Sequence, residues 1–96
     1  MRDNIPDIIK KRGQHPVTRI LDDKEYIEQL FEKLIEEIDE FDEDRNAKEL
    51  ADIFDVLSAL GHALNINGDQ LKKARTKKAA VHGTFKKRLF LEKVED

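Results

Sequence analysis

The feature that most restricts the fold of this chain is a pair of amphipathic segments separated by only a few polar residues. In residues 24–42 and again in residues 47–65, apolar side chains recur every three or four positions, which predicts two long helices. Helices joined by so short a connection pack side by side in opposite directions. The sequence therefore predicts an all-α protein built on an antiparallel helix hairpin. The apolar positions are Ile27, Leu30, Leu34, Ile38 and Phe41 in the first helix and Leu50, Ile53, Leu57, Leu60 and Leu64 in the second.

Two further helices are expected to flank the hairpin. Residues 5–12 are expected to form a short helix that stops at Gly13. Residues 70–82 are expected to form a longer one, with Asp69 as its N-cap and Gly83 after its last turn. Both glycines suit the left-handed backbone that often ends a helix.

The segments near the two termini suggest a small extended element. Residues 18–21 are rich in β-branched side chains, and residues 88–91 are assigned as a short strand that could pair with them. The prediction is thus a tiny two-stranded pairing between the termini of an otherwise helical chain. At 96 residues the chain has room for one domain, residues 1–96.

Composition predicts a thin core and association between copies. A domain of this size buries only about 60–65% of the surface that its unfolded chain exposes. Hydrophobic residues make up 39% of the chain and charged residues 41%, so we expect an oligomeric helical bundle, a homodimer or homotetramer. The absence of cysteine excludes disulfides and thiolate metal sites. No long apolar run is present, so we expect a cytoplasmic protein with no membrane contact.

The charges are divided unevenly along the chain. Residues 22–55 carry fifteen acids and four bases, whereas residues 70–91 carry eight lysines or arginines and no acid. A polyanion with a bound cation would suit both parts. A nucleic-acid partner is not expected, because the net charge is −3 and the acidic part would repel a phosphate backbone.

Four acids in the hairpin should form two layers. In an antiparallel hairpin, residues at equal distances from the turn lie opposite each other, which pairs Glu40 with Glu49 and Glu37 with Asp52. At about 100° per residue, Glu37 falls at the edge of the apolar arc, whereas Glu36 points away from it. Glu49 falls inside the arc of the second helix. By the same estimate Glu40 lies one step farther out than Glu37, and Asp52 lies beside Val56 on the second helix.

Carboxylates brought together in this way repel each other unless a cation or protons compensate. Oxygen ligands favour a hard ion, so Mg²⁺, or alternatively Mn²⁺, is the expected metal. A di-iron site would usually need Glu-x-x-His, and none of the three histidines follows a glutamate by three residues. The alternative is that the acids are solvated, with Glu49 serving only in a capping box with Asn46. Geometry alone leaves both interpretations open.

The paired motifs Glu37-x-x-Glu40 and Glu49-x-x-Asp52 resemble those of the MazG-like all-α nucleotide pyrophosphohydrolases. The terminal segments 2–6 and 77–88 also resemble small single-domain members related to phosphoribosyl-ATP pyrophosphohydrolase. The resemblance implies Mg²⁺-dependent hydrolysis of a nucleoside triphosphate to a monophosphate and pyrophosphate, with non-standard nucleotides among the candidate substrates. The four acids would then hold the metal and carry the catalysis, with one carboxylate as general base.

The basic C-terminal part would then bind the phosphate chain. The leading candidates are Lys77, Lys78, Lys87 and Arg88, with Arg2 or Arg19 approaching from the N-terminal side. Two other functions stay open. One is hydrolysis of phosphoribosyl-ATP, and the other is a non-catalytic helical module for oligomerisation or partner binding. The second is motivated by the eight residues between Glu40 and Glu49, which is short for the family.

Overall fold

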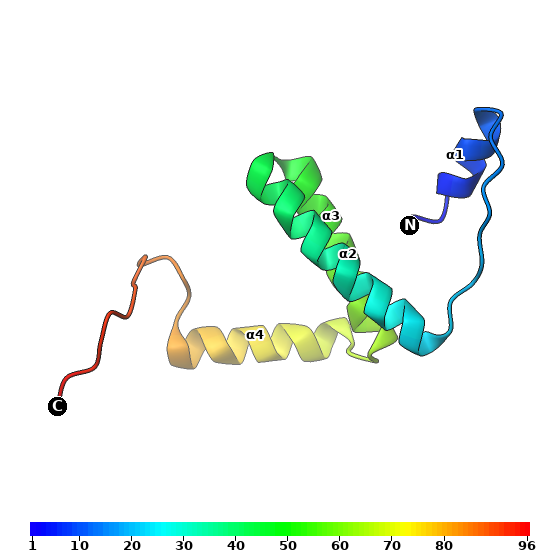
Figure 1. Cartoon of the computed structure of the whole chain (residues 1–96). Coiled ribbons are helices and arrows are strands. Elements are labelled where there is room, and N and C mark those ends of the chain that lie inside the picture. The colour runs from blue at the N-terminus through cyan, green and yellow to red at the C-terminus, as the bar shows by residue number, and fades with distance from the viewer.

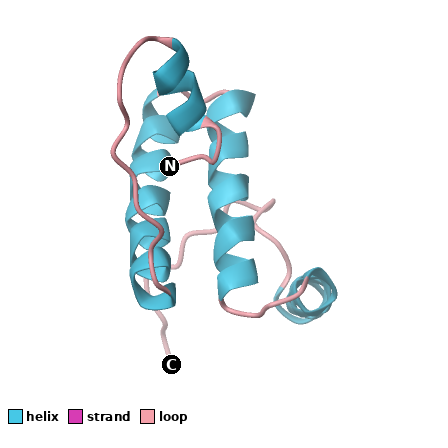
Figure 2. Ribbon diagram, turned by 90° about the vertical axis from the view of Figure 1, so that its right-hand side faces the viewer, coloured by secondary structure: helices cyan, strands magenta, loops and turns pink.

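The computed structural model describes all 96 residues and contains four helices and no strand. They are α1 (Ile5–Lys11), α2 (Asp23–Glu43), α3 (Ala47–Ala63) and α4 (Gly68–His82). Helices α2 and α3 run antiparallel, and they are the only pair of helices in contact with each other (Figures 1 and 2). The prediction of an all-α fold centred on an antiparallel hairpin is confirmed.

The ends of the two hairpin helices follow from their capping residues. The Asp22 side chain accepts a hydrogen bond of 2.9 Å from the backbone N–H of Glu25 and so begins α2. Asn46 begins α3 in the same way, because its side chain accepts a hydrogen bond of 2.9 Å from the backbone N–H of Glu49. Asp44 has a non-helical backbone (φ −115°, ψ 72°) and ends α2. Consequently only three residues separate the two helices.

The start of α4 differs from the prediction. The N-cap is Asn67 rather than Asp69, and its side chain accepts a hydrogen bond of 2.8 Å from the N–H of Gln70. In return, the Gln70 side chain accepts a hydrogen bond of 3.0 Å from the backbone N–H of Asn67, which completes a capping box. This reciprocal pair draws Gly68 into the first turn of the helix. Just before it, Asn65 adopts a left-handed φ of 58°, which prevents α3 from continuing.

The glycines predicted to end the outer helices do so. Gly13 follows α1 with φ 79°, and Gly83 follows α4 with φ 81°. A side chain at either position would strain this backbone, so both sites suit glycine. The N–H of Gly83 bonds to the carbonyl of Ala79 at 3.0 Å and closes the last turn.

The predicted pairing of the terminal segments is wrong, because residues 18–21 and 88–91 form no strand. Arg88 has a left-handed φ of 60°, which interrupts an extended segment. The two termini also lie on opposite sides of the molecule (Figure 1), so neither segment can satisfy the other's backbone groups. Apart from the half-buried Leu21, their side chains lie in solvent, with Ile20 98% exposed.

The seam between α2 and α3 is narrow. Only two residues of the chain are buried, Leu60 and Glu37, each 5% exposed. The expected stripe of α2 is half-buried apart from Ile38, which is 48% exposed. In α3 the prediction is only partly right, because the helix is rotated so that Val56 joins the seam, whereas Leu50, Leu57 and Leu64 are exposed. The half-buried seam residues are Ile27, Leu30, Leu34, Phe41, Ile53, Val56 and Ala63.

A second set of apolar side chains lies beside the seam and is exposed to solvent. Each of them follows a buried or half-buried residue of its helix by one position in the sequence. One position corresponds to a rotation of about 100° about the helix axis, away from the seam. Because the helices are antiparallel, that rotation turns both rows to the same side of the hairpin. We call these residues the outer apolar face; they are Phe31, Ile35, Ile38, Leu50, Phe54 and Leu57, all at least 39% exposed.

The chain is far from compact. Its radius of gyration is 18.4 Å and its longest extent 65 Å, whereas a compact domain of this length has a radius of about 12–13 Å. Helix α4 and the C-terminal tail project away from the hairpin (Figure 1). No helix combines the length and the apolar character needed to cross a bilayer.

Candidate metal centre

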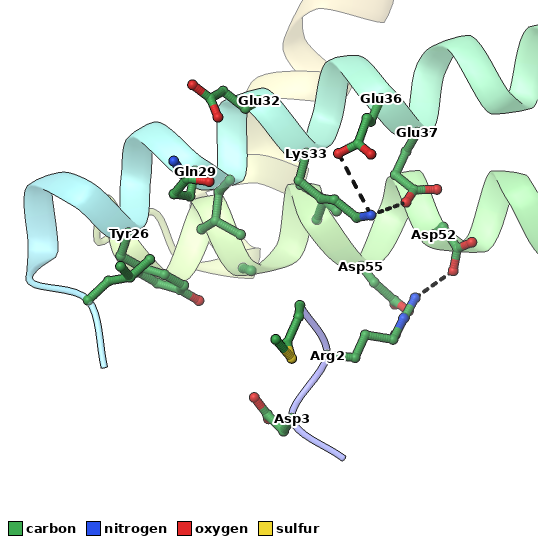
Figure 3. A pocket seen from close by; sticks show the side chains of 15 residues that line it. Arg2, Asp3, Tyr26, Gln29, Glu32, Lys33, Glu36, Glu37, Asp52 and Asp55 are labelled. Carbon is green, nitrogen blue, oxygen red and sulfur yellow. Dashed lines mark hydrogen bonds and ion pairs between the residues drawn. The ribbon is translucent and has the colours of Figure 1, made fainter. Parts of the chain in front are cut away.

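Three of the four predicted acids meet where α2 and α3 face each other. Glu37 of α2 and Glu49 and Asp52 of α3 each offer an oxygen, and these oxygens lie within 4.8 Å of one another. Glu37 and Asp52 belong to the same predicted layer, and Figure 3 shows them directed toward each other from neighbouring helices. The hairpin therefore brings together the predicted pair Glu37 and Asp52, whereas of the predicted pair Glu40 and Glu49 only Glu49 joins the cluster.

Two of the three carboxylates in this cluster each have one oxygen that is removed from water and has no hydrogen-bond partner. Glu37 takes a position of the seam that apolar residues otherwise fill, and its side chain is 6% exposed. Oε2 of Glu37 and Oε2 of Glu49 are both buried and have no hydrogen-bond partner. Burial of a charged group is strongly unfavourable unless an opposite charge or a donor compensates. These two oxygens are therefore candidate ligands for a cation.

The Glu49 side chain does not take part in a capping box with Asn46, which was the alternative to a role in metal binding. In a capping box its side chain would accept a hydrogen bond from the N–H of Asn46, as Gln70 does for Asn67 in α4. Only the other half of the box is present at α3, where Asn46 accepts from the N–H of Glu49. The N–H of Asn46 instead bonds to the carbonyl of Asp44 at 2.6 Å. The Glu49 carboxylate is thus free to face the cluster.

Glu40 lies next to the cluster rather than within it. Its side chain is exposed, and its oxygens are not among those within 4.8 Å of one another. The negative charge of Glu37 raises the pKa of Glu40, with smaller contributions from loss of hydration and from the charge of Glu49. The structure therefore separates one predicted ligand from the other three and gives it a different environment.

Lys33, which the sequence pattern does not single out, compensates part of the cluster's charge. Its Nζ lies 3.1 Å from Oε1 of Glu37 and 3.9 Å from Oε2 of Glu36. The hydrogen bond to Glu37 raises the pKa of Lys33 above its usual value, although partial burial opposes the shift. The four-residue spacing of Lys33 and Glu37 on one helix is the signal that could have identified this pair.

Arg2 reaches the centre from the N-terminal segment. Its guanidinium lies 2.6 Å from Oδ1 of Asp52 and 2.8 Å from Oδ2 of Asp55 (Figure 3). The hydrogen bonds to Asp55 and Asp52 raise the pKa of Arg2 further above its ordinary value. Because a carboxylate has two oxygens, Asp52 can hold Arg2 with one and still offer the other to a cation. Asp55, which was not among the four predicted acids, is thereby connected to the centre.

A cavity of about 560 Å³ opens beside these residues, between the hairpin and the N-terminal segment. One end is lined by acids and by the two cations just described, and the other by Tyr26 and apolar side chains. Its lining residues are Met1, Arg2, Asp3, Leu21, Tyr26, Gln29, Leu30, Glu32, Lys33, Glu36, Glu37, Asp52, Asp55, Val56 and Ala59.

The residues predicted to bind phosphate are elsewhere in the chain. Lys77 and Lys78 lie on α4 and Lys87 and Arg88 on the tail, and both parts project away from the hairpin (Figure 1). Lys77 lines a shallow basic groove of α4 together with Lys72 and Lys73. Arg19 forms an ion pair of 2.6 Å with the carboxylate of Glu25 at the start of α2, away from the cluster. Within one chain the structure does not bring any of these residues to the acids.

Comparisons of the chain with protein-family models, with curated proteins and with solved structures found no match. The chemistry of the centre therefore follows from its own residues. Three carboxylates, two of them with buried and unpaired oxygens, form an all-oxygen donor set. Such a set fits Mg²⁺ or Mn²⁺, which bind a few carboxylates and complete their coordination with water or phosphate oxygens. Glu37, Glu49 and Asp52 are the residues that would hold the ion.

Proposed function

We propose that the protein is an Mg²⁺-dependent nucleotide pyrophosphohydrolase of the MazG-like kind, cleaving a nucleoside triphosphate into a monophosphate and pyrophosphate. The observation that carries this proposal is that Glu37 and Glu49 each have a buried carboxylate oxygen without a hydrogen-bond partner, in a cluster with Asp52 whose ligand oxygens lie within 4.8 Å of one another. An ordinary solvated helix pair would keep such oxygens in water. The paired acid motifs of the sequence support the same reaction class.

In this proposal the acids have two roles. Glu37, Glu49 and Asp52 hold the metal, which when bound neutralises phosphate oxygens and lowers the pKa of an attacking water. Glu40 lies next to the cluster but outside it, so it is the carboxylate left free of the metal to accept a proton from that water. Lys33 and Arg2 keep the carboxylates oriented and contribute positive charge near a bound phosphate chain.

We further propose that the chain acts as a homo-oligomer, a homodimer or homotetramer. The outer apolar face leaves Phe54 63% exposed and Ile35 64% exposed, which a second copy would cover. Helix α4 contacts no other helix of its own chain. In an oligomer, its lysines and the basic tail with Lys87 and Arg88 would approach the acidic hairpin of a neighbouring copy. Opposite charge favours that approach.

The proposal is tested by turnover. The purified protein is incubated with Mg²⁺ and a panel of standard and modified nucleoside triphosphates and phosphoribosyl-ATP, and pyrophosphate release is followed. We expect turnover of at least one compound by the wild type, and loss of at least about 100-fold in Glu37→Gln and Glu49→Gln. Asp39→Asn, an exposed acid of α2 outside both the cluster and the cavity, is the matched control and should retain activity. Activity that survives both substitutions in the cluster would contradict the assigned site.

Glu40→Gln separates the two roles of the acids. A general base typically contributes about 10²–10⁴-fold to the rate, so kcat should fall by that factor. Binding of Mg²⁺ measured by calorimetry should persist in Glu40→Gln and be lost in Glu37→Gln. Loss of Mg²⁺ binding in Glu40→Gln would instead make Glu40 a fourth ligand.

A second candidate function is a non-catalytic helical module for oligomerisation or partner binding. The outer apolar face favours it, because exposed apolar patches of this kind mark protein–protein contacts. The three-residue connection between α2 and α3 also provides no loop to cover a substrate. Calorimetric titration with Mg²⁺ and a non-hydrolysable triphosphate discriminates between the two functions, since this module would bind neither.

A further inference from the structure

We infer that the cavity between the hairpin and the N-terminal segment binds the nucleoside part of the substrate, with Tyr26 as the stacking surface for the base. This inference rests on the proposed function and adds the position of the base to it. The cavity of about 560 Å³ is within the range of about 300–1,000 Å³ that is usual for small-molecule sites.

The two ends of the cavity differ in chemistry. At one end lie Glu37 and Asp52, two residues of the candidate metal centre. At the other end lie the ring of Tyr26 and the apolar side chains of Leu21 and Leu30. A ligand that fills the cavity therefore needs a charged end that binds a cation and a flat apolar end. A nucleotide has both, whereas a free inorganic phosphate has only the first.

The spacing along α2 suits such a ligand. Tyr26 and Glu37 are eleven positions apart, which corresponds to about 16 Å along the helix axis. Figure 3 shows the Tyr26 ring directed from the first turn of α2 toward the N-terminal segment, so the ring shortens this span. A sugar and phosphate chain can lie between the ring and the acids, along Lys33, whose ammonium group is beside Glu37.

Polar groups near the ring can read the edge of a base. Gln29 and Asp3 line the same cavity (Figure 3). The amide of Gln29 offers both donors and an acceptor, and the carboxylate of Asp3 offers acceptors. Tyr26 itself is 41% exposed, so its ring face is available to a ligand. Base–aromatic stacking tolerates any base, and the polar groups would then give preference among bases.

The N-terminal segment forms one wall of this site. Residues 1–3 line the cavity, although α1 contacts no other helix. The ion pairs of Arg2 with Asp52 and Asp55 are what tie this wall to α3, across 50 and 53 residues of sequence. The same pair of contacts places Arg2 beside the acidic end of the cavity, where it can approach the phosphate chain.

The test compares a nucleotide with a ligand that has no base. The affinity of the full-length protein for non-hydrolysable nucleoside triphosphate analogues and for inorganic triphosphate is measured by calorimetry in the presence of Mg²⁺. We expect Tyr26→Ala to weaken nucleotide binding by about 10-fold or more and to leave inorganic triphosphate unchanged. Tyr26→Phe retains the ring and should bind nucleotide within about twofold of the wild type. Phe85→Ala is the matched control, because Phe85 is an aromatic residue 99% exposed on the tail and outside the cavity.

The outcomes separate this inference from the proposed function. If the wild type binds nucleotide and Tyr26→Ala binds it equally well, the base does not stack on Tyr26 and only the inference fails. Loss of affinity in Phe85→Ala instead of Tyr26→Ala also overturns it, by placing the base at the tail. If Tyr26→Ala weakens inorganic triphosphate as much as nucleotide, the residue supports the fold and not a base. If the wild type binds neither ligand, the proposed function fails as well.

Discussion

Glu37→Gln provides the most direct test of the metal centre, because it removes one charge from the buried cluster with little change in shape. In the absence of divalent cations, Glu37 repels two carboxylates whose oxygens lie within 4.8 Å, and it attracts Lys33 at 3.1 Å. With an effective dielectric constant of about 20, each repulsion is about 3.5 kcal/mol or more and the attraction about 5 kcal/mol. The repulsions exceed the attraction by about 2 kcal/mol, and solvent screening weakens both the attraction by Lys33, which is 42% exposed, and the repulsion by Asp52, which is 27% exposed.

The expected result is a reversal of stability between two conditions. Without metal, Glu37→Gln should unfold at a higher temperature than the wild type, because about 1–2 kcal/mol of repulsion is relieved and each kcal/mol shifts Tm by about 4–8 °C. With Mg²⁺ at about 100 times its dissociation constant, the wild type should gain about 2.7 kcal/mol and the variant little. With Mg²⁺ present, the wild type should therefore unfold at a higher temperature than Glu37→Gln, the reverse of the order without metal.

The assay is thermal unfolding followed by circular dichroism at one fixed protein concentration, with EDTA or with increasing Mg²⁺. Glu36→Gln is the matched control, since it removes the same charge from the preceding position of α2 and should keep the Mg²⁺ shift of the wild type. An equal Mg²⁺ shift in Glu37→Gln and the wild type would refute the reasoning. So would a wild type that Mg²⁺ does not stabilise, because the unpaired oxygens would then need no cation.

Two further predictions concern the surroundings of the centre, a third concerns the outer apolar face, and a fourth concerns the basic part of the chain. Arg2→Gln should accelerate amide hydrogen exchange in α1, measured by mass spectrometry, whereas Arg19→Gln should not, because only the Arg2 ion pairs connect the N-terminal segment to α3. The raised pKa of Glu40 means that the folded state binds more protons than the unfolded state above the ordinary pKa of 4.5. Without metal, stability should therefore increase as pH falls toward that value, and this increase should be smaller in Glu40→Gln than in Asp39→Asn, as thermal melts would reveal. Phe54→Asp, on the outer apolar face, should reduce the oligomer mass measured by light scattering; an unchanged mass would exclude this face as the contact between copies. Finally, two inactive variants can be unfolded and refolded together, one with Glu37→Gln and the other with both Lys77→Ala and Lys78→Ala. The mixture should regain activity if one copy supplies the acids and its neighbour supplies the lysines. Activity no greater than the sum of the two separate variants would show that the lysines do not act on a neighbouring copy.

Part of this molecule is predictable because helical periodicity is a local property. The repeat of apolar residues defines α2 and α3 within two residues of their ends, and capping side chains such as Asn46 indicate where they begin. The two acid pairs can be matched in depth because a short connection restricts the register of an antiparallel hairpin. That register pairs Glu37 with Asp52 from residue spacing alone, and the structure confirms the pairing.

The errors arose where a segment depends on a distant partner. Residues 88–91 have the composition of a strand, yet a strand needs a neighbour, and the tail lies far from the N-terminal connector. The rotation of α3 that brought Val56 rather than Leu57 into the seam was decided by packing against α2. Periodicity alone allowed both, because the apolar residues of α3 cover more than one face.

The sequence by itself determined the helices, the hairpin and the depth of each acid along it, since these follow from residue spacing. Only the tertiary structure decided which carboxylates lose their water, because burial depends on how two helices rotate against each other. It separated Glu40 from Glu37, Glu49 and Asp52. It also brought Arg2 to Asp52 across 50 residues, a contact for which no local pattern exists. The cavity between them exists only because these distant parts of the chain meet.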